Sequence, residues 1–255
     1  MSSKTNSRNR PRLSRAEDIL NLRKWMEVEE HEGVEGNFLC NWNIIENAHE
    51  EKELLVYIDG PTNIPAAYQV GGLVCPGILQ VKHTHRRRGI GKKLVEYCIK
   101  RALRADRTLL YIQCKPSTSI PFWESMGFHL IEHDTQDHAY QNLAKSFPVP
   151  GSGVKSQIAI RFYPEAKVWQ PATPPYVEYG AEAVRTTPEI ISLPNRIQFH
   201  EKVWPKQGDT VVEVIVDNRS ILIAKAKYEE SSRAGLKSCP NGWYIDVISE
   251  AAIDV

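Results

Sequence analysis

The sequence has few of the features that mark membrane, secreted or zinc-binding proteins. No apolar run approaches the roughly 18 to 20 residues that a membrane-spanning helix needs, and the first residues, MSSKTNSRNRPR, lack the apolar core of a signal peptide. The five cysteines are scattered and none forms a Cys-x-x-Cys pair, so neither a zinc site nor a disulfide framework is expected. These absences favour a cytoplasmic protein, in a reducing compartment, with no membrane association and no metal.

An excess of charge of one sign is also missing. The chain carries 32 Lys and Arg against 31 Asp and Glu, for a formal net charge of +1. Dedicated nucleic-acid-binding proteins usually show a basic excess, so the balance argues against a nucleic-acid partner. The arginine run at residues 86–88 is therefore a local feature. Nucleic-acid binding through this run and the basic N-terminus stays open as an alternative.

The chain of 255 residues is long enough for one large domain or two smaller ones. Residues 1–13 are polar and are predicted to form a disordered basic tail. The stretch PVPGSG has the composition of a linker, which we place at residues 148–156. The linker separates a first domain, residues 14–147, from a mainly β domain at residues 157–255, so a two-domain protein is expected.

Hydrophobic periodicity predicts a mixed order of elements in the first domain. For example, Leu94, Cys98 and Ala102 recur at helical spacing. The expected order is a helix after residue 14, a helix at 42–51, strands at 53–60, 66–74 and 77–83, a helix at 90–105, a strand at 109–114, a short helix at 119–128, and two final strands. In the second domain, Asp217-Asn218 lies between two apolar runs and predicts a hairpin.

The stretch VKHTHRRRGIGKKL, residues 81–94, predicts a strand, a basic turn, Gly-Ile-Gly and a helix. It is no P-loop, because Arg86 stands at the first glycine of that motif and Lys93 at its Ser or Thr. It also fails the dinucleotide fingerprint, because Leu94 replaces the last glycine. A helix N-terminus offers unpaired N–H groups, and glycine lets the backbone approach a phosphate closely. The stretch therefore suits a pyrophosphate group.

The same residues resemble the acetyl-CoA signature of the GCN5-related N-acetyltransferases (GNAT), Q/R-x-x-G-x-G/A between a strand and a helix. Arg86, Gly89 and Gly91 stand at its fixed positions, and PFWESMGF at 121–128 resembles the family's F-Y-x-x-x-G-F segment. The order of elements also agrees over about residues 14–147. The resemblance implies an α+β fold with a GNAT-type mixed, mostly antiparallel sheet and flanking helices, to which a C-terminal mainly β domain is added.

One element of the family is missing from this pattern. Its members usually open with a strand before the first helix, but residues 1–13 are too polar to predict one. Either that strand is lost, or the later run IAIRFY at 158–163 takes its place.

The resemblance also implies which residues hold acetyl-CoA. The strand before the turn would pair with the pantetheine arm, and the turn would hold the pyrophosphate. Pro116 stands where many members have an Asn that touches the cofactor, so a nearby serine is expected to replace it. The expected contacts are Leu79, Gln80, Val81, Arg86, Arg87, Arg88, Gly89, Ile90, Gly91, Lys92, Trp123 and either Ser117 or Ser119.

The catalytic residues are less defined, because Trp123 replaces the tyrosine that protonates the leaving thiolate in many members. An indole keeps its N–H and cannot act as that acid. Tyr111 falls near the fifth-strand position that often carries a catalytic Glu, and the alternative role for it is a core or pocket aromatic residue. His83 and His85 titrate near neutrality, which suits acid–base work, or they simply solvate the turn.

The acceptor side is predicted from the acidic segment EVEEHEGVEG at 27–36, which joins the first two helices. Glu29, Glu30 and Glu32 would attract a cationic amine, unless the segment is only a solvated loop. The expected function is acetyl-CoA-dependent N-acetyl transfer to a primary amine of a small molecule or peptide. The alternative is a non-catalytic acyl-CoA sensor or interaction module. For residues 157–255, substrate recruitment, self-association into a homodimer and completion of the sheet all stay open.

Overall fold

The computed structural model describes residues 9–148, 151–205 and 207–250. The chain divides into two compact units, an N-terminal unit of residues 1–142 and a C-terminal unit of residues 143–255. Most of the predicted basic tail, residues 1–8, lies outside the described residues. Of the helices in the described ranges, none is long and apolar enough to cross a membrane.

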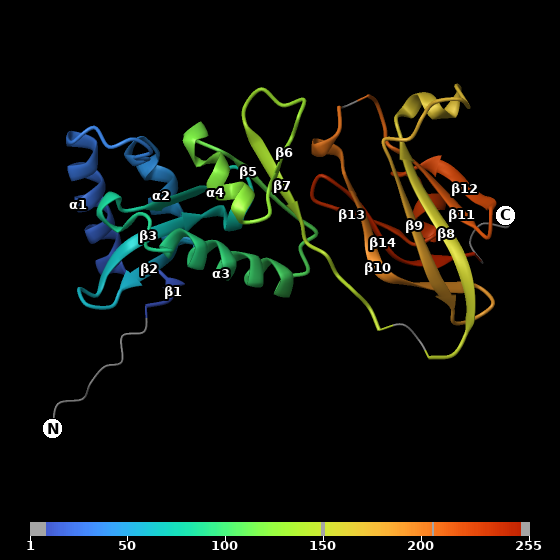
Figure 1. Cartoon of the computed structure of the whole chain (residues 1–255), viewed down its shortest axis with the longest axis horizontal. Helices are drawn as coiled ribbons and strands as arrows, with labels where there is room; N and C mark the ends of the chain where they lie inside the picture. Colours follow the sequence, from blue (N-terminus) through green and yellow to red (C-terminus); the bar gives the residue numbers. More distant parts are fainter. Residues whose placement is uncertain (1–8, 149–150, 206, 251–255) are drawn as a thin grey trace. The chain divides into compact units, whose positions relative to one another are not determined.

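Over its described residues, 9–142, the N-terminal unit contains two antiparallel sheets and four α-helices (Figure 1). The first sheet has the order β1 (Pro11–Leu13), β2 (Leu55–Asp59), β3 (Ile64–Val70) and β4 (Ile78–Val81). The second has the order β5 (Leu109–Gln113), β7 (His138–Asn142) and β6 (His129–Leu130). The helices are α1 (Ala16–His31), α2 (Trp42–Glu50), α3 (Ile90–Arg104) and α4 (Ile120–Ser125). The predicted mixed fold with flanking helices is thus confirmed.

The first strand corrects the sequence analysis on two counts. β1 pairs with β2, with Pro11 opposite Tyr57 and Leu13 opposite Leu55, so a strand does precede α1 within the predicted tail. The run at 158–163 does not replace it, since it belongs to the C-terminal unit. The strand is short and lies at a sheet edge, where backbone pairing suffices and polar side chains are tolerated. Arg12 also binds the buried carboxylate of Asp18 at 2.6 Å.

The helices of the N-terminal unit cover both faces of the first sheet. Leu22 and Met26 of α1 share a buried cluster with Tyr68 and Val70 of β3. Side chains alternate between faces along a strand, so Gln69 points to the opposite face, where its Oε1 accepts a weak hydrogen bond from Cys98 of α3 at 3.4 Å. α1 and α2 therefore lie on one face and α3 on the other.

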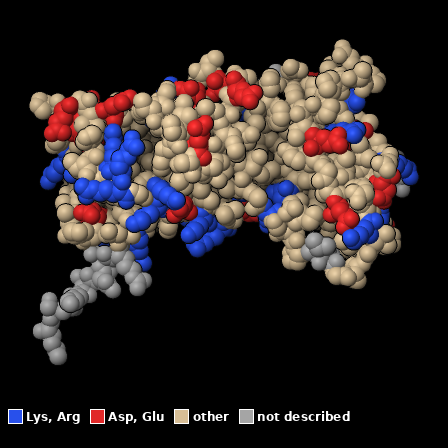
Figure 2. Space-filling model, in the orientation of Figure 1, with Lys and Arg blue, Asp and Glu red and all other residues tan. Residues whose placement is uncertain are grey.

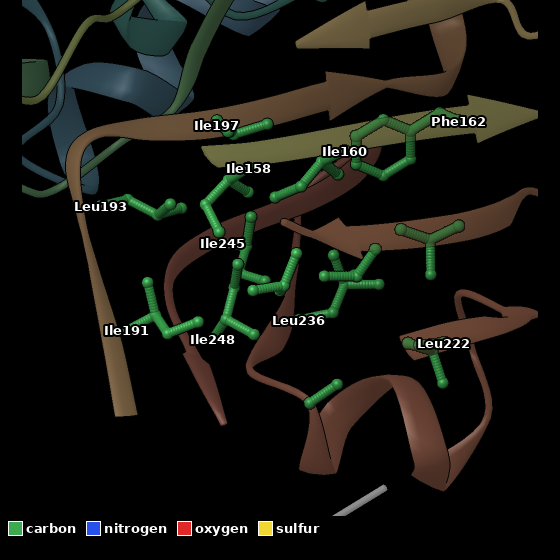
Figure 3. Close-up of a cluster of buried hydrophobic side chains, with 14 of the residues drawn as sticks. Ile158, Ile160, Phe162, Ile191, Leu193, Ile197, Leu222, Leu236, Ile245 and Ile248 are labelled. Atoms are coloured by element: carbon green, nitrogen blue, oxygen red, sulfur yellow. The ribbon is translucent and has the colours of Figure 1, made fainter. Parts of the chain in front are cut away.

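The C-terminal unit is built on one seven-stranded antiparallel sheet with the order β12-β11-β8-β9-β10-β14-β13. Its strands are β8 (Val154–Tyr163), β9 (Val177–Arg185), β10 (Ile190–His200), β11 (Val211–Val216), β12 (Arg219–Lys225), β13 (Leu236–Cys239) and β14 (Gly242–Ser249), with α5 (Glu229–Arg233) between β12 and β13. Figure 3 shows part of its core, in which Ile158, Ile160 and Phe162 of β8 lie near Ile245 and Ile248 of β14. The predicted mainly β character is confirmed.

In this unit, one detail agrees with the sequence analysis and two differ from it. Asp217 and Asn218 form the predicted hairpin turn, with φ of 50° and 66°. β8 begins at Val154, so the end of the predicted linker at 148–156 belongs to a strand. β9 was not predicted, because alternate residues along most of it are exposed and its apolar signal is weak.

Candidate functional site

The two sheets of the N-terminal unit meet at one point and then separate. Pairing between them, over the described residues, is a single parallel bridge from Val74 to Tyr111, with the Cys75 N–H donating to the Tyr111 carbonyl at 2.7 Å. Beyond the bridge β4 and β5 diverge. A groove of about 1160 Å³ lies there, lined by β4, the turn before α3, the end of β5, α4 and the segment between α1 and α2.

The groove side of β4 is an unpaired strand edge. β4 is the last strand of its sheet, and the Lys82 N–H donates to the Ala66 carbonyl of the β3 side at 2.9 Å. Because backbone groups alternate in direction along an antiparallel strand, Gln80 faces β3 and the backbones of Leu79 and Val81 face away from it. The Val81 carbonyl accepts a bond from Arg86 Nε at 3.2 Å. An extended ligand could pair with the remaining groups of Leu79 and Val81.

The turn after β4 presents backbone N–H groups at the same groove. Arg87 and Gly89 adopt positive φ, 63° and 75°, and the first helical bond of α3 runs from Lys93 N–H to the Gly89 carbonyl at 3.1 Å. The N–H groups of residues 90–92 are in the first helical turn and have no partner within the helix. A Cβ on Gly89 would meet nothing within 4 Å, so the backbone is open there. Such a turn binds anions.

A comparison with known protein families covers most of this groove. Residues 50–130 match the family model described as "Acetyltransferase (GNAT) domain". The chain contains a GNAT domain. The matched residues include β4, the anion-binding turn, α3 and α4, and therefore most of the groove.

Solved structures resemble the GNAT domain at low sequence identity. An acetyltransferase of the GNAT family from Staphylococcus aureus Mu50 is 14% identical, with a TM-score of 0.41, and the match covers 52% of this chain and 98% of that one. A GNAT-family acetyltransferase from Listeria monocytogenes 4b F2365 is 12% identical, with a TM-score of 0.42, covering 52% and 94%. The NatC complex bound to Gag peptide and CoA matches at 19% identity and a TM-score of 0.37, covering 52% and 97%. No curated protein sequence matches the chain.

Gln80, which lines the groove, and Glu29 belong to one buried hydrogen-bond network. Gln80 is 2% exposed, and its Oε1 accepts bonds from the Tyr68 hydroxyl at 3.0 Å and the Phe38 N–H at 3.2 Å. Its Nε2 donates to Glu29 at 3.1 Å. Glu29 is 3% exposed and also accepts the His83 N–H at 2.5 Å, so its carboxylate has no room for an acceptor amine.

The arginines of the turn have different roles. Arg86 fastens the turn to its surroundings, because its guanidinium binds the carbonyls of Val81 and, at 2.9 Å, Glu35. Arg87 lines the groove, whereas Arg88 lies outside its lining. Figure 2 shows further Lys and Arg side chains gathered over α3 and the turn before it.

On the opposite wall, the two candidate serines before α4 have different surroundings. Ser119 lines the groove, and its Oγ is buried with no hydrogen-bond partner among the described residues. Ser117 lies outside the lining and donates to Asp137 at 2.8 Å. Of the two serines, Ser119 is the one in the groove lining. Trp123, 7% exposed and packed edge-on against Phe128 at 5.2 Å, forms part of the wall.

The predicted catalytic residues are not brought together. The Tyr111 ring stacks on His138 at 4.9 Å, outside the groove lining, and burial, Asp134 and Cys75 raise its pKa. His83 also lies outside the lining. His85 does line the groove, with Nδ1 3.0 Å from the Thr84 hydroxyl and Nε2 3.8 Å from Asp59, but it lies at the anion-binding turn.

The acidic segment contributes little to the groove. Glu30 and Glu32 are exposed and outside its lining, and Glu35 is the carboxylate that lines it.

Sequence reasoning missed Cys75 and Gln113, which both line the groove beside the bridge between the sheets. Their position depends on where β4 and β5 part, for which the sequence has no local signal. Cys114 is buried, which raises its pKa to about 11, so it is a poor nucleophile.

Proposed function

We propose that the protein is an acetyl-CoA-dependent N-acetyltransferase that moves an acetyl group directly to a primary amine. The observation that carries the proposal is the unpaired edge of β4, which runs straight into the anion-binding turn and faces Ser119 and Trp123 across the groove. Acetyl-CoA would supply an activated thioester. The chain's own residues bind and orient it.

The groove fits such a ligand along its whole length. Leu79 and Val81 would pair with the pantetheine amides, and the N–H groups of residues 90–92 would hold the pyrophosphate. The unpartnered Ser119 hydroxyl would donate to a polar atom of the arm. Positive side chains outnumber negative ones in the lining: Arg86, Arg87, Lys92 and Lys115 against Glu35. This balance suits a ligand with several phosphate charges.

The same charge balance of the groove lining limits which amines can act as the acceptor. A polycation would meet Arg87 and Lys115 without a compensating cluster of carboxylates, because Glu29 is buried and Glu30 and Glu32 lie elsewhere. The α1–α2 side of the groove presents Phe38 and Ile44. We therefore propose an acceptor whose primary amine stands next to an apolar group, on a small molecule or a peptide.

A non-catalytic acyl-CoA sensor is the alternative, favoured by Trp123 in place of the tyrosine acid. Calorimetry with CoA and a thiol-release assay with acetyl-CoA separate the two. The amine panel contains benzylamine, 2-phenylethylamine, spermidine and a peptide with a free α-amino group. We expect CoA binding, and thiol release that depends on an amine and is faster with benzylamine or 2-phenylethylamine than with spermidine. Binding without amine-dependent release would support the sensor, and no CoA binding would refute both.

A further inference from the structure

A contiguous cluster of three side chains, Asp134, His138 and Tyr111, lies on the face of the second sheet away from α4. His138, the first residue of β7, has its Nδ1 2.5 Å from Asp134 Oδ2, and its ring is nearly parallel to that of Tyr111, at 13° and 4.9 Å. A carboxylate that binds one nitrogen of an imidazole fixes the tautomer, so the proton lies on Nδ1 and the lone pair on Nε2. This is the arrangement that makes a histidine a base.

The cluster is held rigidly. Asp134 also accepts the backbone N–H groups of Gln136 at 3.2 Å and of His138 at 2.9 Å. The loop that carries it is bound to the end of β5, because the Gln113 amide donates to the Gln136 carbonyl at 3.2 Å and the Cys114 N–H to the Asp137 carbonyl at 2.9 Å. The imidazole therefore has a fixed place relative to β5.

That place is beside the end of the groove where the sheets part; His138 itself lies outside the groove lining, next to a residue that lines it. His138 stands opposite Gln113 in the pairing of β5 and β7, and Gln113 lines the groove. Directly paired residues project to the same side with their Cβ atoms about 5 Å apart. The parallel bridge at Tyr111, where the sheets part, is two residues away along β5. The whole of β4, about 13 Å at the rise of a strand, separates this end from the anion-binding turn and from His85.

We infer that His138, oriented by Asp134 and stacked on Tyr111, is the base that takes the proton of the acceptor amine. This inference rests on the proposed function. The acceptor arrives mainly as an ammonium ion, so His138 Nε2 first takes one proton from it and releases that proton to solvent. As the neutral nitrogen then bonds to the acetyl carbon and the carbon–sulfur bond breaks, a second proton passes from the nitrogen through His138 Nε2 to the departing sulfur. Tyr111, predicted as a catalytic residue, is then a positioning residue.

The groups around His138 are themselves charged or titratable. Burial raises the pKa of Asp134, but hydrogen bonds from His138 and Gln136 outweigh burial and hold the pKa below its usual value. Burial first, then Asp134 and Cys75, raises the pKa of Tyr111. The other titratable groups nearby are Asp137, bound by Ser117 and 4.0 Å from Lys115, and the pair of His129 and Tyr140 farther along the same face.

The test compares variants in the thiol-release assay, with the amine of the panel that wild type acetylates fastest. We expect His138→Gln to lower kcat at pH 7 by about 100-fold or more, the usual contribution of a general base. The loss should shrink as pH rises, because a growing fraction of the amine is then already neutral. Asp134→Asn should cost about 10-fold. Tyr111→Phe, which keeps the stacked ring and loses only the hydroxyl, should cost far less than His138→Gln, and the control His129→Gln should stay within about twofold. CoA affinity should not change in any of the four.

A second measurement does not depend on turnover. In protein with ¹³C-labelled histidine rings and saturated with CoA, adding the same amine should shift the His138 signal, identified by its loss in His138→Gln, more than the His129 signal. The inference is overturned if His138→Gln keeps kcat within threefold of wild type, if Tyr111→Phe carries the 100-fold loss, or if the amine leaves the His138 signal in place. Absence of amine-dependent release in wild type would instead refute the proposed function, and the inference with it.

Discussion

The substitution Gly89→Asp tests most directly whether the turn before α3 holds the pyrophosphate of CoA. Gly89 has a φ of 75°, and a Cβ added to it would meet no atom within 4 Å, so the new carboxylate finds space at the mouth of the groove. Two unit charges about 5 Å apart interact by about 1 kcal/mol in water and about 3 kcal/mol at an effective dielectric of 20. For the two charges of a pyrophosphate, the expected loss of binding free energy is therefore about 2 to 6 kcal/mol, or a rise in Kd of about 30-fold or more.

Two controls separate charge from backbone strain. Gly33 has a similar φ of 67°, also has no atom within 4 Å of an added Cβ, and lies outside the groove lining. Gly33→Asp should therefore cost similar stability, about 1 kcal/mol, and leave CoA affinity unchanged. Gly89→Asn has the same shape as Gly89→Asp without the charge and should retain most of the affinity. Isothermal titration with CoA gives the Kd of each variant, and urea unfolding gives its stability. Wild-type affinity in Gly89→Asp, or equal losses in Asp and Asn, would refute the placement of the pyrophosphate.

Three further predictions concern other residues of the N-terminal unit. Ser119→Ala should weaken CoA binding about fivefold, since its hydroxyl has no partner in the described chain, whereas Ser117→Ala should leave the Kd measured by calorimetry unchanged. Glu29→Ala should lower the free energy of unfolding in urea by about 3 kcal/mol, because Gln80 and the His83 N–H lose a buried charged acceptor, while the exposed Glu30→Ala should change it by less than about 0.5 kcal/mol. At pH 8, iodoacetamide should modify Cys40 and Cys75 long before Cys114 and Cys98, because burial raises the pKa values of the latter two to about 11 and about 12. Mass spectrometry should show that CoA protects Cys75 alone, since Cys75 lines the groove. If CoA changed the modification rate of neither Cys40 nor Cys75, the result would contradict the site.

The features that the sequence predicted well depend on local signals. The start of α3 was predicted because Gly89 and Gly91 break the strand pattern and Leu94, Cys98 and Ala102 follow at helical spacing. The turn between β4 and α3 followed from the same residues. The hairpin at Asp217-Asn218 is equally local, since both residues tolerate positive φ.

The features that were missed depend on contacts between distant residues. β1 exists because three residues pair with β2, more than forty positions away, and no pattern so short predicts a strand. Glu29 looks like one carboxylate of a solvated acidic segment, but its partner Gln80 is 51 residues away and buries it. Asp134 lies in a loop without periodicity and His138 begins β7 four residues later, and only the pairing of β7 with β5 brings them near the groove.

The replacement of the family's tyrosine by Trp123 affects the two halves of the proposed proton transfer unequally. A thiol has an ordinary pKa of about 8.5, so a thiolate leaves readily near neutral pH and gains little from a dedicated acid. A primary amine has an ordinary pKa near that of lysine, about 10.4, and is almost entirely protonated under the same conditions. Loss of the acid at Trp123 therefore costs less than loss of a base would. The groove has Trp123 in place of the tyrosine, but His138, bound to the carboxylate of Asp134, lies near the end of the groove where the sheets part. This combination is consistent with an active transferase and favours the enzyme over the sensor.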